Sequence, residues 1–525
     1  MMGRKGRDGG TNRRLGQIAL SAAITLCLTP SASYAQKIGG RITVALEEDL
    51  RGLDPRRDRD GMSDPVHMHV VEGLMGYADD LSVRPMLASS YAIGEDGKSY
   101  AFKLRDNVRF HNGKPLTSAE VKWSWDYLMA ADSIWRCKAV FDGPIKVAGV
   151  ETPDAQTIVF RLDQPNGSFV YNLARTDCAG TPVLHPESVD AEGKWKSVIG
   201  TGPFQLGERR IGQYTEVKRF PDYALSDTEA TGRVGRKEAL VETVRFTVVA
   251  DPSARLVGLR SGDLDITPLT AEMADQIEKD PKLHVTSSDT TVWYALLFGM
   301  NDPILKDVRM RRAIAAAIDR NAVAQGVSFG QWSGTATPVP SASLLYTRPS
   351  PEDEASSLTR AKALLAEAKY SGQPITLIAN KALPMMFSQA VIVQAMLQAA
   401  GINAVIETLE WGLQLDRYTK GTYQAQSFGY SGRFDPMGAW ERFVGPESRK
   451  VWKDEEAIAL LNKGMKTADP QEMKQVSDQL YKKFLNDVPA VSLYHVKAFY
   501  GVSDRLAGVK ASPLEVVRAW NVSIK

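Results

Sequence analysis

The sequence predicts an α/β protein with more than one folded core. Its clearest unit spans residues 375–409, where a β-branched strand (375–379), a helix (389–400) stopped by Gly401 and a second strand (404–409) follow one another. A strand–helix–strand unit places its two strands parallel, with a right-handed crossover. About 490 residues follow the N-terminal segment, and a chain of this size is enough for two or three domains.

Strands and helices alternate along the rest of the chain. Further strands are predicted from their β-branched and aromatic content over 41–46, 100–104, 157–162, 244–249 and 490–495. Thr117-Ser118-Ala119-Glu120 is a capping box that opens a helix through about Met129, and other helices are predicted over 307–319 and 357–368. Two α/β lobes facing each other leave a cleft, which is the usual place for a ligand in this class.

The first 35 residues have the pattern of a secretory signal peptide. Five basic residues precede an apolar stretch from Leu15 to Leu28, and a small-residue site ending at Ala35 makes Gln36 the expected first mature residue. The apolar stretch is well short of the ~20 residues that span a bilayer, which favours cleavage over a permanent anchor. Arg13-Arg14 leaves the twin-arginine route open beside ordinary secretion. We expect the mature protein in the periplasm.

Net charge gives no reason to expect a polyanionic partner. Removing residues 1–35 takes away five basic residues and one acidic residue, which turns the formal charge of +2 into −2. A nearly neutral surface provides no electrostatic attraction for nucleic acid or for an anionic membrane.

Two cysteines, Cys137 and Cys178, remain in the mature sequence. In an oxidising compartment they are candidates for a disulfide, and two buried free thiols are the alternative. A bond between them would close a loop of roughly 40 residues and contribute about 3–4 kcal/mol.

Motifs that would indicate an enzyme are incomplete. The run from Gly429 to Gly432 begins like a nucleophile elbow, but Arg433 stands where the closing glycine is needed. Gly200-Thr201-Gly202 begins like a dinucleotide fingerprint, which Pro203 breaks. The sequence contains no HExxH, C-x-x-C or phosphate loop. We therefore predict no catalytic residue, no cofactor and a function other than catalysis.

His67 and His69 are two residues apart, so on a strand they would share a face and could bind a metal ion. With no nearby cysteine or third histidine, a structural or solvated role is the preferred interpretation, and no metal site is predicted.

One segment and several shorter motifs resemble a known family. Residues 99–128, SYAFKLRDNVRFHNGKPLTSAEVKWSWDYL, are similar to the signature of the family 5 extracellular solute-binding proteins, the dipeptide, oligopeptide and nickel receptors of ABC importers. Further matches follow in the family's order over 53–55, 200–204, 259–266, 307–320 and 435–436. The resemblance covers nearly the whole mature chain, although most of these motifs are structural.

The resemblance implies a fold of the type II periplasmic-binding-protein kind, with two α/β lobes, a two-segment hinge and an extra subdomain. The expected division is a first lobe over 36–80, 198–268 and 491–525, an extra subdomain over 81–197, and a second lobe over 269–490. Both cysteines then fall in the extra subdomain, which makes their pairing geometrically reasonable. Such receptors close around the ligand and deliver it to a membrane permease, and we expect a monomer without a cofactor.

The resemblance also directs attention to residues 430–436. In dipeptide and oligopeptide receptors an aspartate before the Asp-Pro pair holds the α-amino group of the peptide. Gly432 takes that place in this sequence and Arg433 adds a positive charge, a form similar to members that take glutathione-like or other anionic solutes. Arg433 is therefore the leading candidate to bind a ligand carboxylate, because a guanidinium can hold one with two hydrogen bonds. The alternative is that Arg433 pairs with Asp435 or Glu441 and braces its own loop.

Aromatic residues near the expected cleft complete the candidate site. Rings offer a large contact area and stack on peptide planes, but each can equally be a core residue. The candidates for ligand binding are Arg433, Tyr430, Trp411, Trp293, Tyr294, Asp435 and Trp440.

The leading prediction is a periplasmic receptor that captures a peptide-like or anionic solute for an ABC importer. Receptors for nickel chelates, haem, opines or oligosaccharides are alternatives of the same class. A periplasmic hydrolase and a chaperone-like protein are alternatives from other classes.

Overall fold

The computed structural model describes residues 39–58, 62–143 and 146–525. The expected signal peptide lies outside the described residues. Among the helices that are described, none is long and apolar enough to cross a membrane.

A ten-stranded sheet organises most of the chain, with the strand order β14-β13-β15-β12-β16-β11-β1-β10-β9-β8. Its strands are β1 (Arg41–Leu46), β8 (Phe204–Arg210), β9 (Tyr214–Arg219), β10 (Thr243–Val248), β11 (Ile266–Leu269), β12 (Leu283–Phe298), β13 (Ile375–Ala379), β14 (Ala404–Thr408), β15 (Ala425–Tyr430) and β16 (Ala490–Ser503). We call the part built on β1 and β8–β11 the first lobe and the part built on β13–β15 the second lobe. This arrangement confirms the predicted α/β class.

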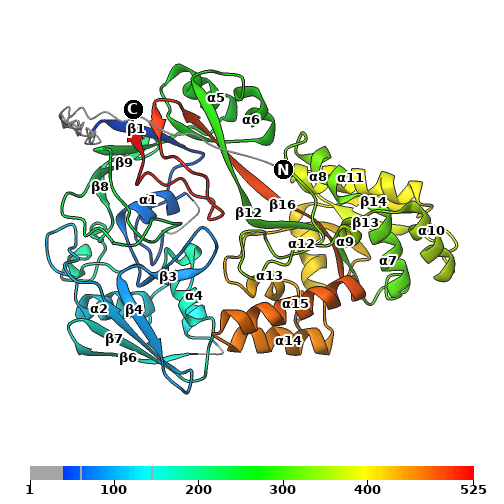
Figure 1. Ribbon diagram of the computed structural model, residues 1–525, viewed down its shortest axis with the longest axis horizontal. Coiled ribbons are helices and arrows are strands. Elements are labelled where there is room, and N and C mark those ends of the chain that lie inside the picture. Colours follow the sequence, from blue (N-terminus) through cyan, green and yellow to red (C-terminus); the bar gives the residue numbers. More distant parts are fainter. Residues whose placement is uncertain (1–38, 59–61, 144–145) are drawn as a thin grey trace, which may run out of the picture. The chain divides into compact units, whose positions relative to one another are not determined.

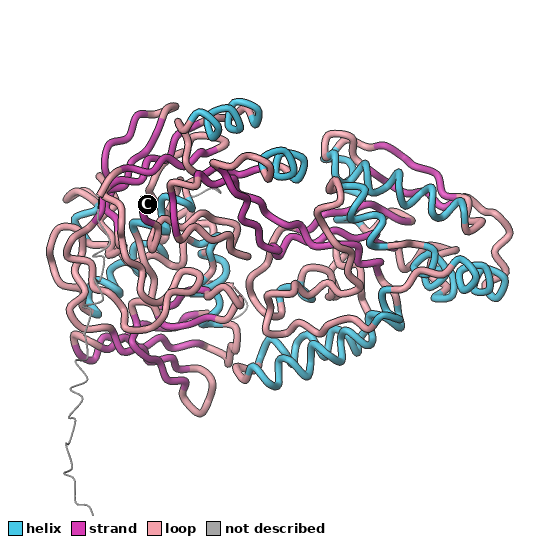
Figure 2. Tube along the Cα trace, turned by 45° about the horizontal axis from the view of Figure 1, so that its top comes forward, coloured by secondary structure: helices cyan, strands magenta, loops and turns pink. Residues whose placement is uncertain are grey.

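Two long strands, β12 and β16, connect the lobes (Figure 1). They pair with each other antiparallel, while β16 also pairs with β11 of the first lobe and β12 also pairs with β15 of the second. Their register shifts between Asp289 and Trp293, so Thr290–Val292 have no partner on β16. The same pair of strands runs between the lobes in the tilted view (Figure 2). Two crossing segments of this kind are the expected form of the hinge.

The strand–helix–strand unit of the second lobe forms as predicted. β13 and β14 are parallel, and the helix between them, α11 (Pro384–Ala399), begins five residues earlier than expected because Pro384 suits a first helical turn. Val393 and Leu397 of this helix are buried in a core that also contains residues of α7 (Val308–Ala317) and α10 (Leu358–Glu367).

A separate four-stranded sheet, in the order β4-β5-β7-β6, forms the extra subdomain together with α2. Its elements are β4 (Ala88–Ile93), β5 (Ser99–Leu104), β6 (Val147–Asp154), β7 (Thr157–Leu162) and α2 (Ser118–Met129). The predicted capping box is present, since Oε2 of Glu120 accepts from the backbone N–H of Thr117 at 2.9 Å. Trp125 of α2 packs on Phe160 of β7 with ring centroids 5.0 Å apart, which fixes the helix against the sheet.

Shorter elements complete the chain. The strands are β2 (Met75–Tyr77), β3 (Val83–Pro85), β17 (Leu506–Ala507) and β18 (Ser523–Ile524). The helices are α1 (Asp64–Val70), α3 (Lys138–Phe141), α4 (Phe169–Ala174), α5 (Pro252–Ser261), α6 (Ala271–Ile277), α8 (Arg320–Val327), α9 (Pro351–Glu354), α12 (Trp411–Lys420), α13 (Gly438–Glu441), α14 (Glu455–Lys466) and α15 (Pro470–Asp487), with 3₁₀ turns at Thr176–Cys178 and Pro186–Ser188.

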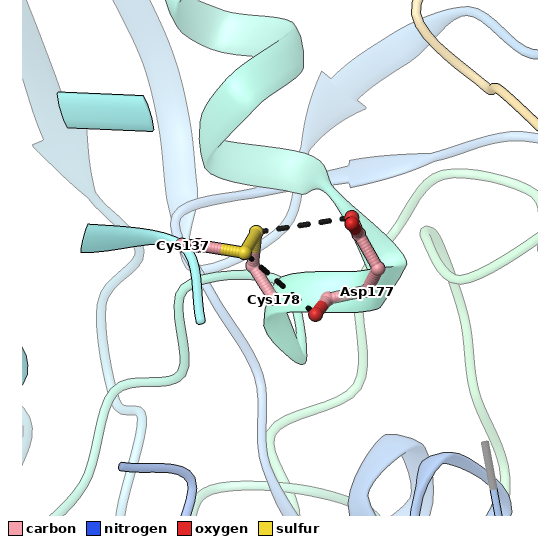
Figure 3. Close-up of side chains that lie close together, drawn as sticks. All are labelled: Cys137, Asp177 and Cys178. Atoms are coloured by element: carbon pink, nitrogen blue, oxygen red, sulfur yellow. Dashed lines mark hydrogen bonds between the residues drawn. A yellow bond between two sulfur atoms is a disulfide. The ribbon is translucent and has the colours of Figure 1, made fainter. Parts of the chain in front are cut away.

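Cys137 and Cys178 are joined by a disulfide in the extra subdomain, with their Cα atoms 5.7 Å apart. Both residues are buried, and Asp177 lies against the sulfur atoms (Figure 3). Cys137, Asp177 and Cys178 are close enough together to resemble a metal site, but the bond removes both thiolates that such a site would use.

His67 and His69 lie on the helix α1, so the shared strand face considered from the sequence does not exist. Nε2 of His67 lies 3.1 Å from the carbonyl oxygen of Leu53. His69 packs between Phe204, Phe246 and Trp520 in the core of the first lobe. The packing supports a structural role for His69.

His69 should make the fold sensitive to acid. Its Nε2 accepts from the backbone N–H of Ala519 at 2.9 Å and its Nδ1 lies against the carbonyl oxygen of Pro65, so its surroundings fit the neutral ring. Burial lowers the pKa of His69 from 6.5 to about 4. A depressed pKa contributes stability above pH 6.5 that is lost as the pH falls through 4, about 3 kcal/mol in total. Urea unfolding between pH 7 and 4 should therefore show a steeper loss for the unmodified protein than for His69→Asn; equal slopes would contradict this role.

Candidate functional site

The candidate site is built on the segment that follows β15. The strand ends at Tyr430, a loop covers 431–437, and the short helix α13 follows. Oδ1 of Asp435 accepts from the backbone N–H of Gly438 at 2.9 Å and so fixes the turn into α13. This segment carries four of the seven residues predicted from the sequence: Tyr430, Arg433, Asp435 and Trp440.

Aromatic side chains support this segment from the core. Trp293 of β12 stacks on Tyr430 with centroids 5.4 Å apart, and Phe443 packs against Trp293 at 5.3 Å and Trp440 at 5.9 Å. The indole N–H groups of Trp293 and Trp440 donate to Ser492 and Ser477. Trp293 and Trp440 are both 0% exposed, so the direct ligand contact expected of them is not met in this structure. They position the loop from behind.

Tyr294 and Trp411 lie away from this cluster. Tyr294 belongs to the core on the other side of the sheet, where it stacks on Tyr494 at 5.2 Å. It follows Trp293 on the same strand, and successive side chains of a strand point to opposite faces. Trp411 opens α12, is 37% exposed, and reaches the cluster only through Phe428 at 5.8 Å.

Arg442 is a buried cation beneath the loop. Its guanidinium lies 5.2 Å from the ring centre of Trp293 and 5.9 Å from that of Tyr430, and it donates to the carbonyl oxygens of Ala439, Pro338 and Thr291. Burial, reinforced by the positive charge of Arg433, lowers the pKa of Arg442 to about 9. Sequence analysis did not single out this residue, although a charged residue within the apolar run from Ala439 to Val444 was a usable signal.

Arg433 is exposed, and within the described residues its side chain forms no ion pair. Its Nη1 donates to the carbonyl oxygen of its neighbour Gly432 at 3.0 Å. The two carboxylates considered as braces have other partners: Glu441 pairs with Lys450 at 2.8 Å, and Asp435 accepts from Gly438. Arg433 and Arg442 therefore leave an excess of positive charge around this loop.

Residues from the N-terminal part of the chain face the loop. Tyr77 of β2 contacts Phe434 with ring centroids 5.8 Å apart. Burial raises the pKa of Asp435 to about 6, and the positive charge of Arg175 opposes that rise in part. Arg175 itself forms a two-pronged ion pair with Asp177, at 2.7 and 2.9 Å. Titratable groups with perturbed pKa values are typical of binding sites, which supports this position as the site.

A pocket of about 1080 Å³ lies elsewhere, lined among others by Arg84, Arg105 and Asp227. None of the seven predicted residues lines it.

The chain resembles known proteins over most of its length. Residues 82–450 match the family model described as "Bacterial extracellular solute-binding proteins, family 5 Middle". A Brucella ovis protein that carries the provisional name of ABC transporter peptide-binding protein is 31% identical over 354 residues, which cover 65% of this chain and 63% of that relative. The glutathione-binding protein GsiB of Escherichia coli K12 is 24% identical over 521 residues, which cover 95% of this chain and 96% of that protein.

Solved structures show the same fold. HbpA2 from Haemophilus parasuis has a TM-score of 0.82 and 24% identity, and the match covers 93% of this chain and all of that one. The periplasmic murein tripeptide-binding protein MppA, in its unliganded open form, has a TM-score of 0.80 and 20% identity, with 93% and 99% coverage. The family model covers more than half of the sequence and its motifs recur in the family's order. The chain belongs to family 5 of the bacterial extracellular solute-binding proteins.

Proposed function

We propose that this protein is the receptor of an ABC importer, which captures a peptide-like solute bearing a carboxylate and passes it to a membrane permease. The observation that carries the proposal is the meeting of charged groups at the connection between the lobes, where Arg433, Arg442 and Asp435 lie beside the crossing strands β12 and β16. A ligand that contacts both lobes binds the closed form best and so shifts the protein towards it.

Arg433 is the proposed anchor for the carboxylate. Both acidic residues that could have braced it have other partners, and the buried Arg442 adds a second positive charge. A guanidinium that loses its water on closure needs an anionic partner, and the solute supplies it. Tyr430 and Trp411 remain proposed contacts, with Trp293 and Trp440 as their support from the core.

Work outside the cytoplasm fits this role. The signal-peptide pattern of the first 35 residues and the family to which the chain belongs both support a periplasmic location. Binding and release make and break no covalent bond, so the receptor needs no catalytic group or cofactor. We propose that it acts as a monomer that docks on permease subunits in its closed form.

Closure without chemistry is the expected result in solution. Glutathione and short peptides are the first solutes to test, because relatives that span most of this chain are named as glutathione-binding and oligopeptide-binding proteins. Small-angle X-ray scattering should show a smaller radius of gyration when a bound solute is present, and mass spectrometry should recover that solute unchanged. A converted product would contradict the receptor and favour a hydrolase. Unchanged scattering at saturation would contradict closure.

A further inference from the structure

Two oxygen atoms converge on the space above Gly432. A Cβ atom at this position would lie 2.6 Å from Oγ1 of Thr291 and 3.1 Å from Oε1 of Glu515. The first distance is shorter than real Cβ contacts, so only glycine leaves this space free without a shift of its neighbours. Thr291 lies in the unpaired stretch of β12, and Glu515 lies in the C-terminal segment whose residues Val516 and Val517 pack in the first lobe. The space therefore lies where the two lobes meet.

Both of these side chains lack partners within the described part of the protein. Thr291 is 0% exposed, and its Oγ1 has no hydrogen-bond partner. The carboxylate of Glu515 forms neither a hydrogen bond nor an ion pair there. Solvent reaches Glu515, yet burial raises its pKa to about 7 with no cation opposing the rise. A carboxylate with these properties lies in a narrow opening and not on an open surface.

The charges around Gly432 are separated in space. Glu515 presents a carboxylate from the first lobe, and Arg433 presents a guanidinium from the second, folded onto the carbonyl oxygen of Gly432. A carboxylate beside a hydroxyl oxygen offers acceptors only suited to a donor-rich cation, and an ammonium group carries three donors. A solute with an amino group and a carboxylate complements both sides.

We propose that Glu515 and Thr291 form a subsite for the ammonium group of the solute, while Arg433 holds its carboxylate. The transported solute is then a zwitterion with a free amino group, such as an unblocked short peptide. This inference rests on the proposed receptor function and narrows its substrate class. It also gives the ligand a contact on each lobe, so that the solute itself bridges them in the closed form.

Calorimetry with paired probes tests the subsite. The probes are glutathione and trialanine, each with its N-acetylated counterpart, which keeps the carboxylates but has no ammonium group. The unmodified protein should bind each free-amine probe at least about tenfold more tightly than its acetylated counterpart, since a hydrogen-bonded charge is lost on acetylation.

Three variants separate the possible roles. Glu515→Gln should weaken binding of the free-amine probes by about tenfold to a hundredfold and leave the acetylated probes unchanged. Thr291→Val keeps the shape of the side chain and should give a smaller loss with the same selectivity. Glu367→Gln removes an exposed carboxylate from α10 and should change neither affinity. Circular dichroism and thermal melting confirm that each variant is folded.

The outcomes distinguish this inference from the receptor function on which it rests. Equal binding of free and acetylated probes by the unmodified protein would overturn the ammonium subsite and leave the receptor standing. Stronger binding of both probes by Glu515→Gln would show that Glu515 only neutralises Arg433, which also overturns the subsite. If neither free-amine probe binds to the unmodified protein, the subsite and the proposed peptide-like solute both fail.

Discussion

Replacing Arg433 by alanine should cost about 2–5 kcal/mol of solute binding, a loss of about 30-fold to several thousandfold in affinity. The reason is that closure removes water from the guanidinium and from the solute carboxylate, so truncating one partner leaves the other buried and unpaired. Arg433→Lys should recover only part of the loss, because an ammonium group restores the charge without the two-pronged geometry. Isothermal titration with any solute that the unmodified protein binds measures both values.

The stability of the solute-free variants decides between an anchor and a brace. Arg433 forms no ion pair within the described residues, so thermal melting of Arg433→Ala should stay within a few degrees of the unmodified protein. Arg360→Ala removes an exposed arginine from α10 and serves as the matched control, with binding unchanged. Unchanged affinity together with a lower melting temperature would show that Arg433 braces its own loop, and the anionic-solute proposal would then lose its main support.

The disulfide should contribute about as much to stability as Arg433 does to binding. Cys137 and Cys178 are 41 positions apart in sequence, and closing a loop of that length restricts the unfolded chain by about 4 kcal/mol. The double variant Cys137→Ala/Cys178→Ala should therefore lower the free energy of unfolding in urea by about this amount. Alanine is preferred to serine because both positions are buried and a new hydroxyl would need a partner.

Reduction provides the internal control for this prediction. A reductant should lower the stability of the unmodified protein towards that of the double variant and leave the variant unaffected. Titration of the denatured, unreduced protein should find no free thiol in the mature chain. Two titratable thiols, or a variant as stable as the unmodified protein, would contradict the bond.

Local signals in the sequence predicted the regular elements well. The strand over 41–46, the capped helix α2 and the parallel unit around α11 all formed where β-branched content, caps and periodicity placed them. The longest strand, β12, was missed because a polar run, Thr286-Ser287-Ser288-Asp289-Thr290-Thr291, interrupts its apolar pattern. That run lies where the strand crosses between lobes, so a polar sequence and strand structure coexist there. β16 was expected to end at 495 and continues to Ser503 for the same crossing.

The candidate site was predictable only in part. The segment from Tyr430 to Trp440 could be found because the family resemblance points to it, and the structure places its residues together. The aromatic residues could not be divided into contacts and support, because burial depends on partners such as Phe443 and Ser492 that are remote in sequence. Glu515 was missed for a related reason: it reaches Gly432 from 83 positions further along the chain, and only the folded sheet brings them together.

The position of β16 has a consequence for how the chain is made. β16 lies between β12 and β11, and it is formed by residues 490–503 of a chain of 525. Without it, the ten-stranded sheet separates into two pieces, each with an unpaired edge. During synthesis from the N-terminus, neither lobe can be joined to the other until almost the last residues have left the ribosome. A chain that stays incomplete for so long remains threadable, which is the state that an export channel accepts, and its final sheet is assembled only on the far side.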